Sequence, residues 1–263
     1  MILFLFLTHL GLGIVFTLAL VSREAGVKFF RFNAGLAAAL IAVAFVFRSA
    51  EAETGGSRLA FQALVVVEAA VVLYWATVGR ALARVRPFIL GLACVAGLIA
   101  LVAQGIDAAW GRAVTMQVLT VASFLSSAAL LGGACTSMIL GHWYLIIPTL
   151  QVKHLQNIVK VHMASMVVRI AVVAAAVIFA IATWQPGLGP SFRHYITSIS
   201  GVFFWQRVLF GLAGPSLLSY MTWVTAKIRS TQSATGILYV DFFTVVVGEV
   251  LAKYLLLATN VPV

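Results

Sequence analysis

Residues 234–258 read ATGILYVDFFTVVVGEVLAKYLLLA, and this stretch contains only three charged side chains, those of Asp241, Glu249 and Lys253. A helix needs about 20 consecutive, mostly apolar residues to cross the hydrocarbon layer of a bilayer. A charged side chain in that layer costs about 2.5–3.5 kcal/mol on insertion scales, so it is expected to face the protein interior. The stretch therefore predicts a membrane-spanning helix that packs its charged residues against other spans.

Seven further apolar runs of similar length precede this one, and charged residues, glycine or proline separate them. The eight predicted spans lie roughly at 2–21, 29–47, 59–79, 87–106, 114–141, 158–183, 198–226 and 234–258. Because their connections are short, we expect residues 1–263 to form a single transmembrane domain. The predicted fold is all-α, a polytopic bundle of eight transmembrane helices in the lipid bilayer.

The composition excludes a soluble protein. Of the 263 residues, 63% are hydrophobic and 9% are charged, against about 45–50% and 25% in soluble domains. A net charge of +10 would suggest nucleic acid as the partner of a soluble protein, whereas here we interpret it as a topology signal and expect no nucleic-acid partner. The odd-numbered connections, counted with Arg31 and Lys160 at the adjoining span ends, carry ten basic residues, and the even-numbered ones carry four. By the positive-inside rule, the odd connections are cytoplasmic and both termini lie outside.

Besides Arg31 and Lys160 near the span ends, six charged residues fall within the predicted spans, three acidic and three basic: Glu68, Arg169, Arg207, Asp241, Glu249 and Lys253. Depths follow from a rise of 1.5 Å per residue along each helix. A first candidate site for quinone and protons lies near mid-membrane and consists of His9, Glu68, Arg207 and Glu249. A second candidate site near the inner face consists of His142, Tyr144, His162 and Asp241.

Two interpretations of these intramembrane groups stay open. Buried ion pairs can fix the register of neighbouring helices. Intramembrane carboxylates beside histidine also suit coupled proton transfer, with histidine and tyrosine hydrogen-bonded to quinone carbonyls. Depth alone does not say which helices are neighbours.

The stretch GHWYLIIP at 141–148 gives a further alternative. Trp143 and Tyr144 are typical of an interfacial aromatic belt, and Pro148 would end the helix. Neither role explains His142. Since His142 and His162 lie at similar depth on consecutive antiparallel spans, a haem b held by these two histidines is an alternative to the quinone site.

The sequence lacks the motifs of a self-contained enzyme. There is no GxxxxGK[ST], no GxGxxG after a strand and no HExxH. Cys94 and Cys135 lie in apolar runs without a pair motif, which excludes a zinc or iron–sulfur site held by cysteines of this chain. We assign no catalytic residue and no metal ligand, and whether the chain is itself catalytic stays open. A partner is expected to supply the redox cofactors.

Three segments carry a family resemblance. They are the opening span LFLTHLGLGIVFTLALV, which ends at Val21, the segment FWQRVLFGLAG at 204–214, and the segment VVVGEVLAKYLLL at 245–257. With the eight-span order, they resemble the membrane-anchor subunits of the polysulfide reductase and DMSO reductase type, the NrfD/DmsC-like family. The chain departs from that pattern at Lys253, where arginine is expected, and in the GHWYLIIP stretch, which identifies it as a divergent member.

The resemblance implies a quinone-interacting membrane subunit of a respiratory oxidoreductase complex in a bacterial or archaeal cytoplasmic membrane. Such a subunit anchors the complex and passes electrons between a partner iron–sulfur subunit and menaquinone or ubiquinone. The iron–sulfur subunit is attached to a redox catalytic subunit, and the anchor usually has no haem. Two alternatives are a di-histidine cytochrome b-type subunit and a structural subunit or small transporter.

Overall fold

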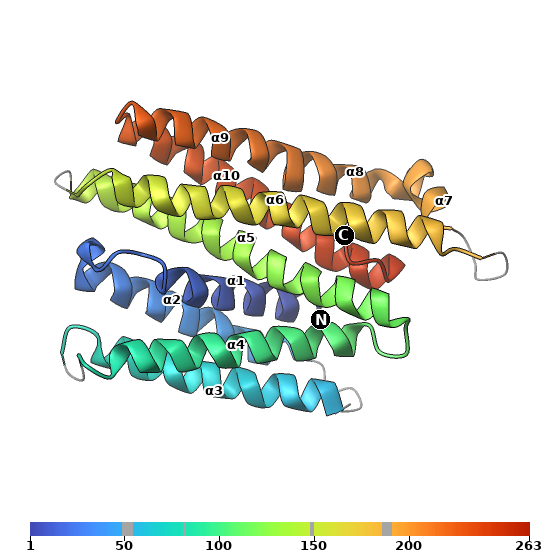
Figure 1. The fold of residues 1–263 in the computed structure, drawn as a ribbon, viewed down its shortest axis with the longest axis horizontal. Helices are drawn as coiled ribbons and strands as arrows, with labels where there is room; N and C mark the ends of the chain where they lie inside the picture. Colours follow the sequence, from blue (N-terminus) through green and yellow to red (C-terminus); the bar gives the residue numbers. More distant parts are fainter. Residues whose placement is uncertain (49–54, 81–82, 148–149, 186–190) are drawn as a thin grey trace.

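The computed structural model describes residues 1–48, 55–80, 83–147, 150–185 and 191–263, and within these ranges every regular element is a helix (Figure 1). The longer helices are α1 (Ile2–Leu18), α2 (Gly26–Val46), α3 (Gly55–Thr77), α4 (Arg86–Ala108), α5 (Val114–Ile146), α6 (Lys153–Ala182), α9 (Gly214–Lys227) and α10 (Thr231–Thr259). The shorter elements are η1 (Arg23–Ala25), α7 (Phe192–Thr197), η2 (Ile199–Gly201), α8 (Val202–Val208) and the π-helical turn η3 (Leu209–Ala213). The predicted helix stop at Pro148 lies outside the described residues.

The helices have the dimensions of membrane spans. Seven helical segments of the described chain are long and apolar enough to cross a membrane: Arg23–Val46, Gly55–Thr77, Arg86–Ala108, Val114–Ile146, Lys153–Ala182, Ile199–Lys227 and Thr231–Thr259. The remaining apolar helix, α1, is shorter, with 17 residues, and most of it is buried in the bundle. The protein is therefore a polytopic helical membrane protein.

The central element of the bundle is α5. With 33 residues it extends about 50 Å at the usual rise per residue. It packs against α1 and α4 and also against α6 and α10. Figure 1 shows it running obliquely between a group formed by α1–α4 and a group formed by α6–α10. Side chains of α5 therefore reach residues from both groups.

Glycines bring α1 and α5 into direct backbone contact. A Cβ atom added to Gly13 would lie 2.1 Å from the carbonyl oxygen of Ala128, and one added to Gly132 would lie 2.1 Å from the carbonyl oxygen of Gly13. Only glycine fits at such a crossing, as in other membrane helix pairs with small residues at the interface. This close approach carries α1 into the centre of the bundle.

The seventh predicted span is not one regular helix. It consists of η2, α8, the π turn η3 and α9 in succession. Pro215 lies just after the π turn and has no N–H to donate to the carbonyl of Gly211, so the regular helical hydrogen-bond pattern is interrupted there. Turns of this kind are often found at functional sites.

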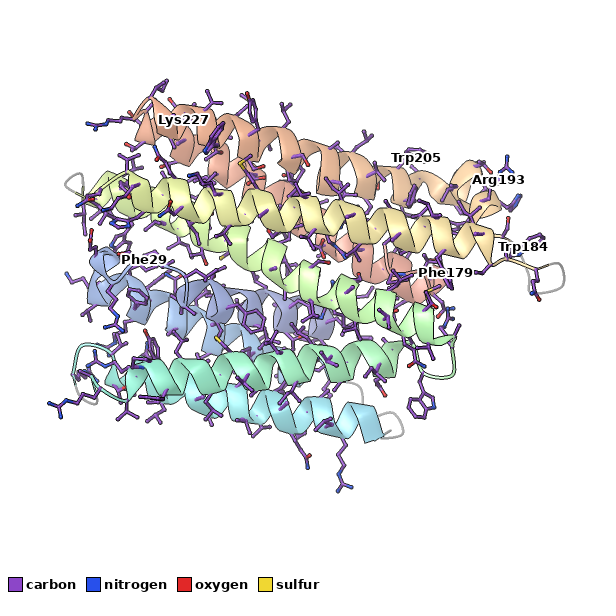
Figure 2. All side chains as sticks on the ribbon, in the orientation of Figure 1. Phe29, Phe179, Trp184, Arg193, Trp205 and Lys227 are labelled. Atoms are coloured by element: carbon purple, nitrogen blue, oxygen red, sulfur yellow. The ribbon has the colours of Figure 1, made fainter. Side chains whose placement is uncertain are left out.

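The two ends of the bundle differ in their number of basic residues. The last turns of α1, α3, α5 and α9 lie at one end of the bundle, where the odd connections begin, and both chain termini lie away from it (Figure 1). Figure 2 shows Lys227 at that end and Arg193 at the opposite end. The ten basic residues of the odd connections are therefore gathered at one end of the bundle.

Candidate functional site

The site centres on the carboxylate of Glu249, in the middle of α10. Its Oε1 accepts hydrogen bonds from Arg169 Nε at 2.9 Å and Arg207 Nη2 at 2.8 Å. Its Oε2 accepts from Ser127 Oγ at 2.5 Å, Arg169 Nη2 at 3.2 Å and Lys253 Nζ at 3.3 Å. These five residues, which we call the Glu249 cluster, come from α10, α6, α8 and α5, and none is more than 2% exposed. One carboxylate thus holds three cations.

Ser127 joins the cluster to His9 of α1. The serine donates its single proton to Glu249, so its oxygen accepts from Lys253 Nζ at 2.6 Å and from His9 Nδ1 at 3.2 Å. In the neutral imidazole the proton then lies on Nδ1, and Nε2 is left as an acceptor. The ring also packs edge-on against Phe124, with centroids 4.7 Å apart. His9 is therefore oriented by two contacts to α5.

Arg169 has further partners that fix its guanidinium. Its Nη1 donates to the carbonyl oxygen of Ser123 at 3.1 Å and to the hydroxyl of the same residue at 2.7 Å. Its Nη2 donates to the main-chain oxygen of Val263 at 3.3 Å. Val263 is 1% exposed, so the segment that follows α10 folds back into the bundle. Residues of α5, α10 and this segment together hold Arg169 in one geometry.

Helical spacing explains part of the arrangement. Ser123 and Ser127 are four residues apart and share one face of α5, and Glu249 and Lys253 share one face of α10 in the same way. Side chains in a helix point back toward its N-terminus. Lys253 therefore extends over the preceding turn and reaches the carboxylate of Glu249.

The approach of η3 to α10 brings in Arg207. A Cβ atom on Gly211 would lie 2.6 Å from the Cα atom of Gly248 and 2.1 Å from Nη1 of Arg207. The two glycines thus let the backbones meet beside the guanidinium. The π turn and Gly248, the neighbour of Glu249 in the sequence, together place Arg207 on the carboxylate.

The Glu249 cluster has more positive than negative charge. Three cationic side chains surround one carboxylate. Three buried nitrogens at the site have no hydrogen-bond partner among the described residues, namely Nε2 of His9 and Nε and Nη1 of Arg207. Because charges interact more strongly in a medium of low dielectric constant, the surplus favours negative charge that develops nearby.

A second buried pair joins α6 and α10, two of the helices that contribute to the Glu249 cluster. His162 Nε2 of α6 is 2.8 Å from Asp241 Oδ2 of α10, and both side chains are 0% exposed. His162 precedes Arg169 by seven residues and Asp241 precedes Glu249 by eight, which is about 10–12 Å along each helix. The pair is therefore separate from the Glu249 cluster, but it joins α6 to α10 through side chains, as Arg169 and Glu249 also do.

The structure joins three of the four residues expected at mid-membrane and separates the fourth. His9, Arg207 and Glu249 belong to one contact network, whereas Glu68 does not. Glu68 lies on α3, which packs on α2 and α4, and its Oε2 is buried without a hydrogen-bond partner in the described chain. The expectation that Glu68 lies with His9, Arg207 and Glu249 is corrected. Glu68 is on a peripheral helix, so its position along that helix does not bring its side chain to the Glu249 cluster.

The four residues expected near the inner face do not form one site either. Only His162 and Asp241 contact each other. The exposed His142 instead has its Nδ1 3.0 Å from the hydroxyl of Tyr239. The hydroxyl of Tyr144 donates to the carbonyl of Gln151 and accepts from the amide of Leu155 at 3.3 Å, so it stabilises the connection between α5 and α6.

His142 and His162 do not fit as the two axial ligands of a haem in this structure. Nε2 of His162 is engaged by Asp241. A Cβ atom on Gly133 of α5 would lie 3.3 Å from Nδ1 of His162, so the two helices are packed together on the other side of the ring. His142 points to Tyr239 at the exposed end of α5. A porphyrin would have to displace these contacts.

Several residues of the site were not assigned to it from the sequence. Lys253 was recognised only as an intramembrane charge, and its long side chain reaches back by one turn to Glu249. Arg169 was recognised as an intramembrane charge without a partner. Ser127 and Ser123 gave only a weak signal, the serines of the stretch SFLSS at 123–127 inside an apolar span. The contact of Val263 with Arg169 depends on the return of the chain after α10 and has no local signal.

Among the described residues, no group of three or more His, Cys, Asp or Glu side chains is placed to hold a metal ion. No protein-family model, curated protein or solved structure matches the chain. The chemistry of the Glu249 cluster is therefore the basis for a functional assignment.

Proposed function

We propose that the chain is a quinone-interacting integral membrane subunit of a respiratory oxidoreductase complex, a divergent member of the NrfD/DmsC-like family. It passes electrons between a partner iron–sulfur subunit and menaquinone or ubiquinone, and it anchors the catalytic subunit. In this proposal α1 also crosses the membrane, which gives eight spans. The odd connections are cytoplasmic, and both termini lie outside a bacterial or archaeal cytoplasmic membrane.

One observation carries the proposal: the Glu249 cluster has three cations for one carboxylate and lies beside His9, whose Nε2 has no hydrogen-bond partner among the described residues. Reduction of a quinone places negative charge on its carbonyl oxygens before protons arrive. Cations and N–H groups that are already oriented stabilise such charge without reorganisation. The N–H groups at Nε and Nη1 of Arg207 can donate to a quinone carbonyl, and Nε2 of His9 can accept from a quinol hydroxyl.

A bound quinone supplies two-electron, two-proton redox chemistry. His9 Nε2, as the acceptor in the neutral ring, takes a proton from a quinol hydroxyl and returns one during reduction. Arg207 provides positive charge beside the ring. Ser127 links His9 to Glu249 and Lys253, so protonation of the imidazole is coupled to the cluster.

A second candidate function is that of a structural subunit in which the cluster fixes the helices. It is favoured by the fact that both oxygens of Glu249 already accept at least two hydrogen bonds each. Saturated buried charge networks of this kind can fix the register of helices. This function needs neither a quinone nor the free nitrogen of His9.

Purification of the full chain with its bound partners from its natural membrane tests the proposal. We expect an iron–sulfur subunit in the particle and quinol oxidation by it. His9→Gln should lower turnover by at least about 100-fold, since a positioned general base contributes 10²–10⁴-fold, with an unchanged amount of assembled particle. Glu68→Gln is the matched control and should leave turnover unchanged, because Glu68 lies apart from the cluster.

Two results would contradict the proposal. One is a particle without any redox subunit. The other is a His9→Gln particle that assembles and oxidises quinol like the unchanged protein. A His9→Gln variant that only lowers the amount of folded chain would favour the structural function.

A further inference from the structure

A cavity of about 520 Å³ opens at the end of the bundle where the odd connections begin, apart from the Glu249 cluster. It is lined by the last residues of α1 and α3, by η1 and the start of α2, and by the first turns of α4. Ligand sites in proteins usually measure about 300–1,000 Å³. The cavity is therefore large enough for part of an amphiphilic molecule.

The lining of the cavity has two chemically distinct parts. Apolar side chains such as Leu18, Phe30 and Leu90 form one wall, and Arg23, Arg86 and Tyr74 supply polar atoms. None of the described lining residues is acidic. A molecule that fits this cavity has an anionic group and an apolar chain.

The acidic residue nearest in sequence to Arg23 is engaged elsewhere. The Oε2 atom of Glu24 is 2.6 Å from Nε2 of His154, at the start of α6. Glu24 therefore interacts with another part of the bundle and does not line the cavity beside Arg23. Arginine is well suited to phosphate, because its planar guanidinium can donate two parallel hydrogen bonds.

We propose that this cavity binds one anionic phospholipid, with the phosphate beside Arg23 and Arg86 and an acyl chain along the apolar wall. Basic pockets between transmembrane helices on the cytoplasmic side are typical sites for anionic lipid headgroups. The excess of basic residues at this end of the bundle agrees with that side of the membrane. The proposal does not depend on the function of the Glu249 cluster.

Two residues of the lining allow a sharp test. A Cβ atom on Gly91 has no atom within 4 Å, so a larger side chain there enters the cavity without a clash at its Cβ. Cys94 also lines the cavity and is half-buried, whereas Cys135, the other cysteine of the chain, is 3% exposed. The reaction of Cys94 with a maleimide therefore reports whether the cavity is filled.

The experiment uses the full chain in nanodiscs of phosphatidylcholine, with or without phosphatidylglycerol. We expect phosphatidylglycerol to slow the labelling of Cys94 and to remain bound to the protein in native mass spectrometry. Arg23→Gln and Arg86→Gln should each weaken this protection about tenfold, the effect of losing one charge-assisted hydrogen bond. Arg80→Gln is the matched control, because Arg80 is exposed at the same end and does not line the cavity.

Further arms of the experiment identify the occupant. Gly91→Leu should abolish retention of the lipid while the arginines are unchanged, and Gly91→Ala serves as its folding control. Protection of Cys94 by inorganic phosphate or glycerol phosphate in phosphatidylcholine discs would assign the site to a soluble phosphate compound and overturn the proposal. Equal protection by a quinone, or protection that survives both arginine substitutions, would also overturn it.

Discussion

Replacement of Glu249 by glutamine should lower the free energy of unfolding of the bundle. Among the described residues, Glu249 is the carboxylate that contacts Arg169, Arg207 and Lys253. An amide keeps the shape of the side chain but leaves three buried cations without compensation. Removing one partner of a buried ion pair costs about 3–5 kcal/mol, a large share of the 5–15 kcal/mol that stabilises a typical protein.

The measurement is the free energy of unfolding of the purified chain, obtained by titrating mixed micelles with SDS. We expect Glu249→Gln to lower this free energy by about 3–5 kcal/mol. Glu68→Gln is the matched control, a carboxylate in a span whose Oε2 has no hydrogen-bond partner in the described chain. It should change the free energy by less than about 1 kcal/mol.

A double variant tests whether surplus charge is the cause. Lys253→Met removes one of the three cations, so Glu249→Gln combined with Lys253→Met should be more stable than Glu249→Gln alone. Neighbouring charges in one network show such non-additive effects, of about 0.5–3 kcal/mol. The reasoning is refuted if Glu249→Gln matches Glu68→Gln, or if the two substitutions in the cluster simply add.

Four further substitutions can be measured in the same unfolding titration. Gly13→Ala should destabilise the chain by about 1–3 kcal/mol, since the added Cβ meets the backbone of α5. Gly91→Ala has open space at its Cβ and should stabilise the helix by about 0.5–1 kcal/mol. Equal effects of the two substitutions would contradict the close crossing of α1 and α5. Tyr144→Phe should cost about 1–2 kcal/mol, because the carbonyl of Gln151 loses its donor, and it should leave quinol turnover unchanged. Reduced turnover in a folded variant would show that Tyr144 takes part in quinol oxidation. Asp241→Leu should cost about 3–5 kcal/mol by leaving His162 without its buried partner, and a neutral result would show that the pair is not formed.

The sequence was sufficient to predict the long apolar helices and to group three polar residues that the structure brings together. Apolar runs of membrane length define the spans, and the rise per residue gives depth. His9, Arg207 and Glu249 were expected at one level and do meet in one network. Helix length and the position of a residue along its helix can be predicted because they are properties of each span by itself.

Lateral packing could not be obtained in this way. Glu68 was expected at the depth of Glu249 but lies on α3, which packs on α2 and α4. The six charged residues within the predicted spans sum to zero, yet three cations meet one carboxylate while Asp241 pairs with His162. Local charge balance depends on which helix faces meet. The close approach of Gly211 to Gly248, which brings Arg207 to Glu249, joins two separate helical elements and cannot be read from either one alone.

The order of the cluster along the chain has a consequence for biogenesis. Arg169 and Arg207 precede Glu249, so during synthesis both arginines enter the membrane before their carboxylate exists. Each then bears an uncompensated insertion penalty of about 2.5–3.5 kcal/mol. Arrival of α10 removes that penalty, and the return of Val261–Val263 into the bundle completes the partners of Arg169. A nascent chain that has not yet added α10 therefore holds both arginines without their carboxylate.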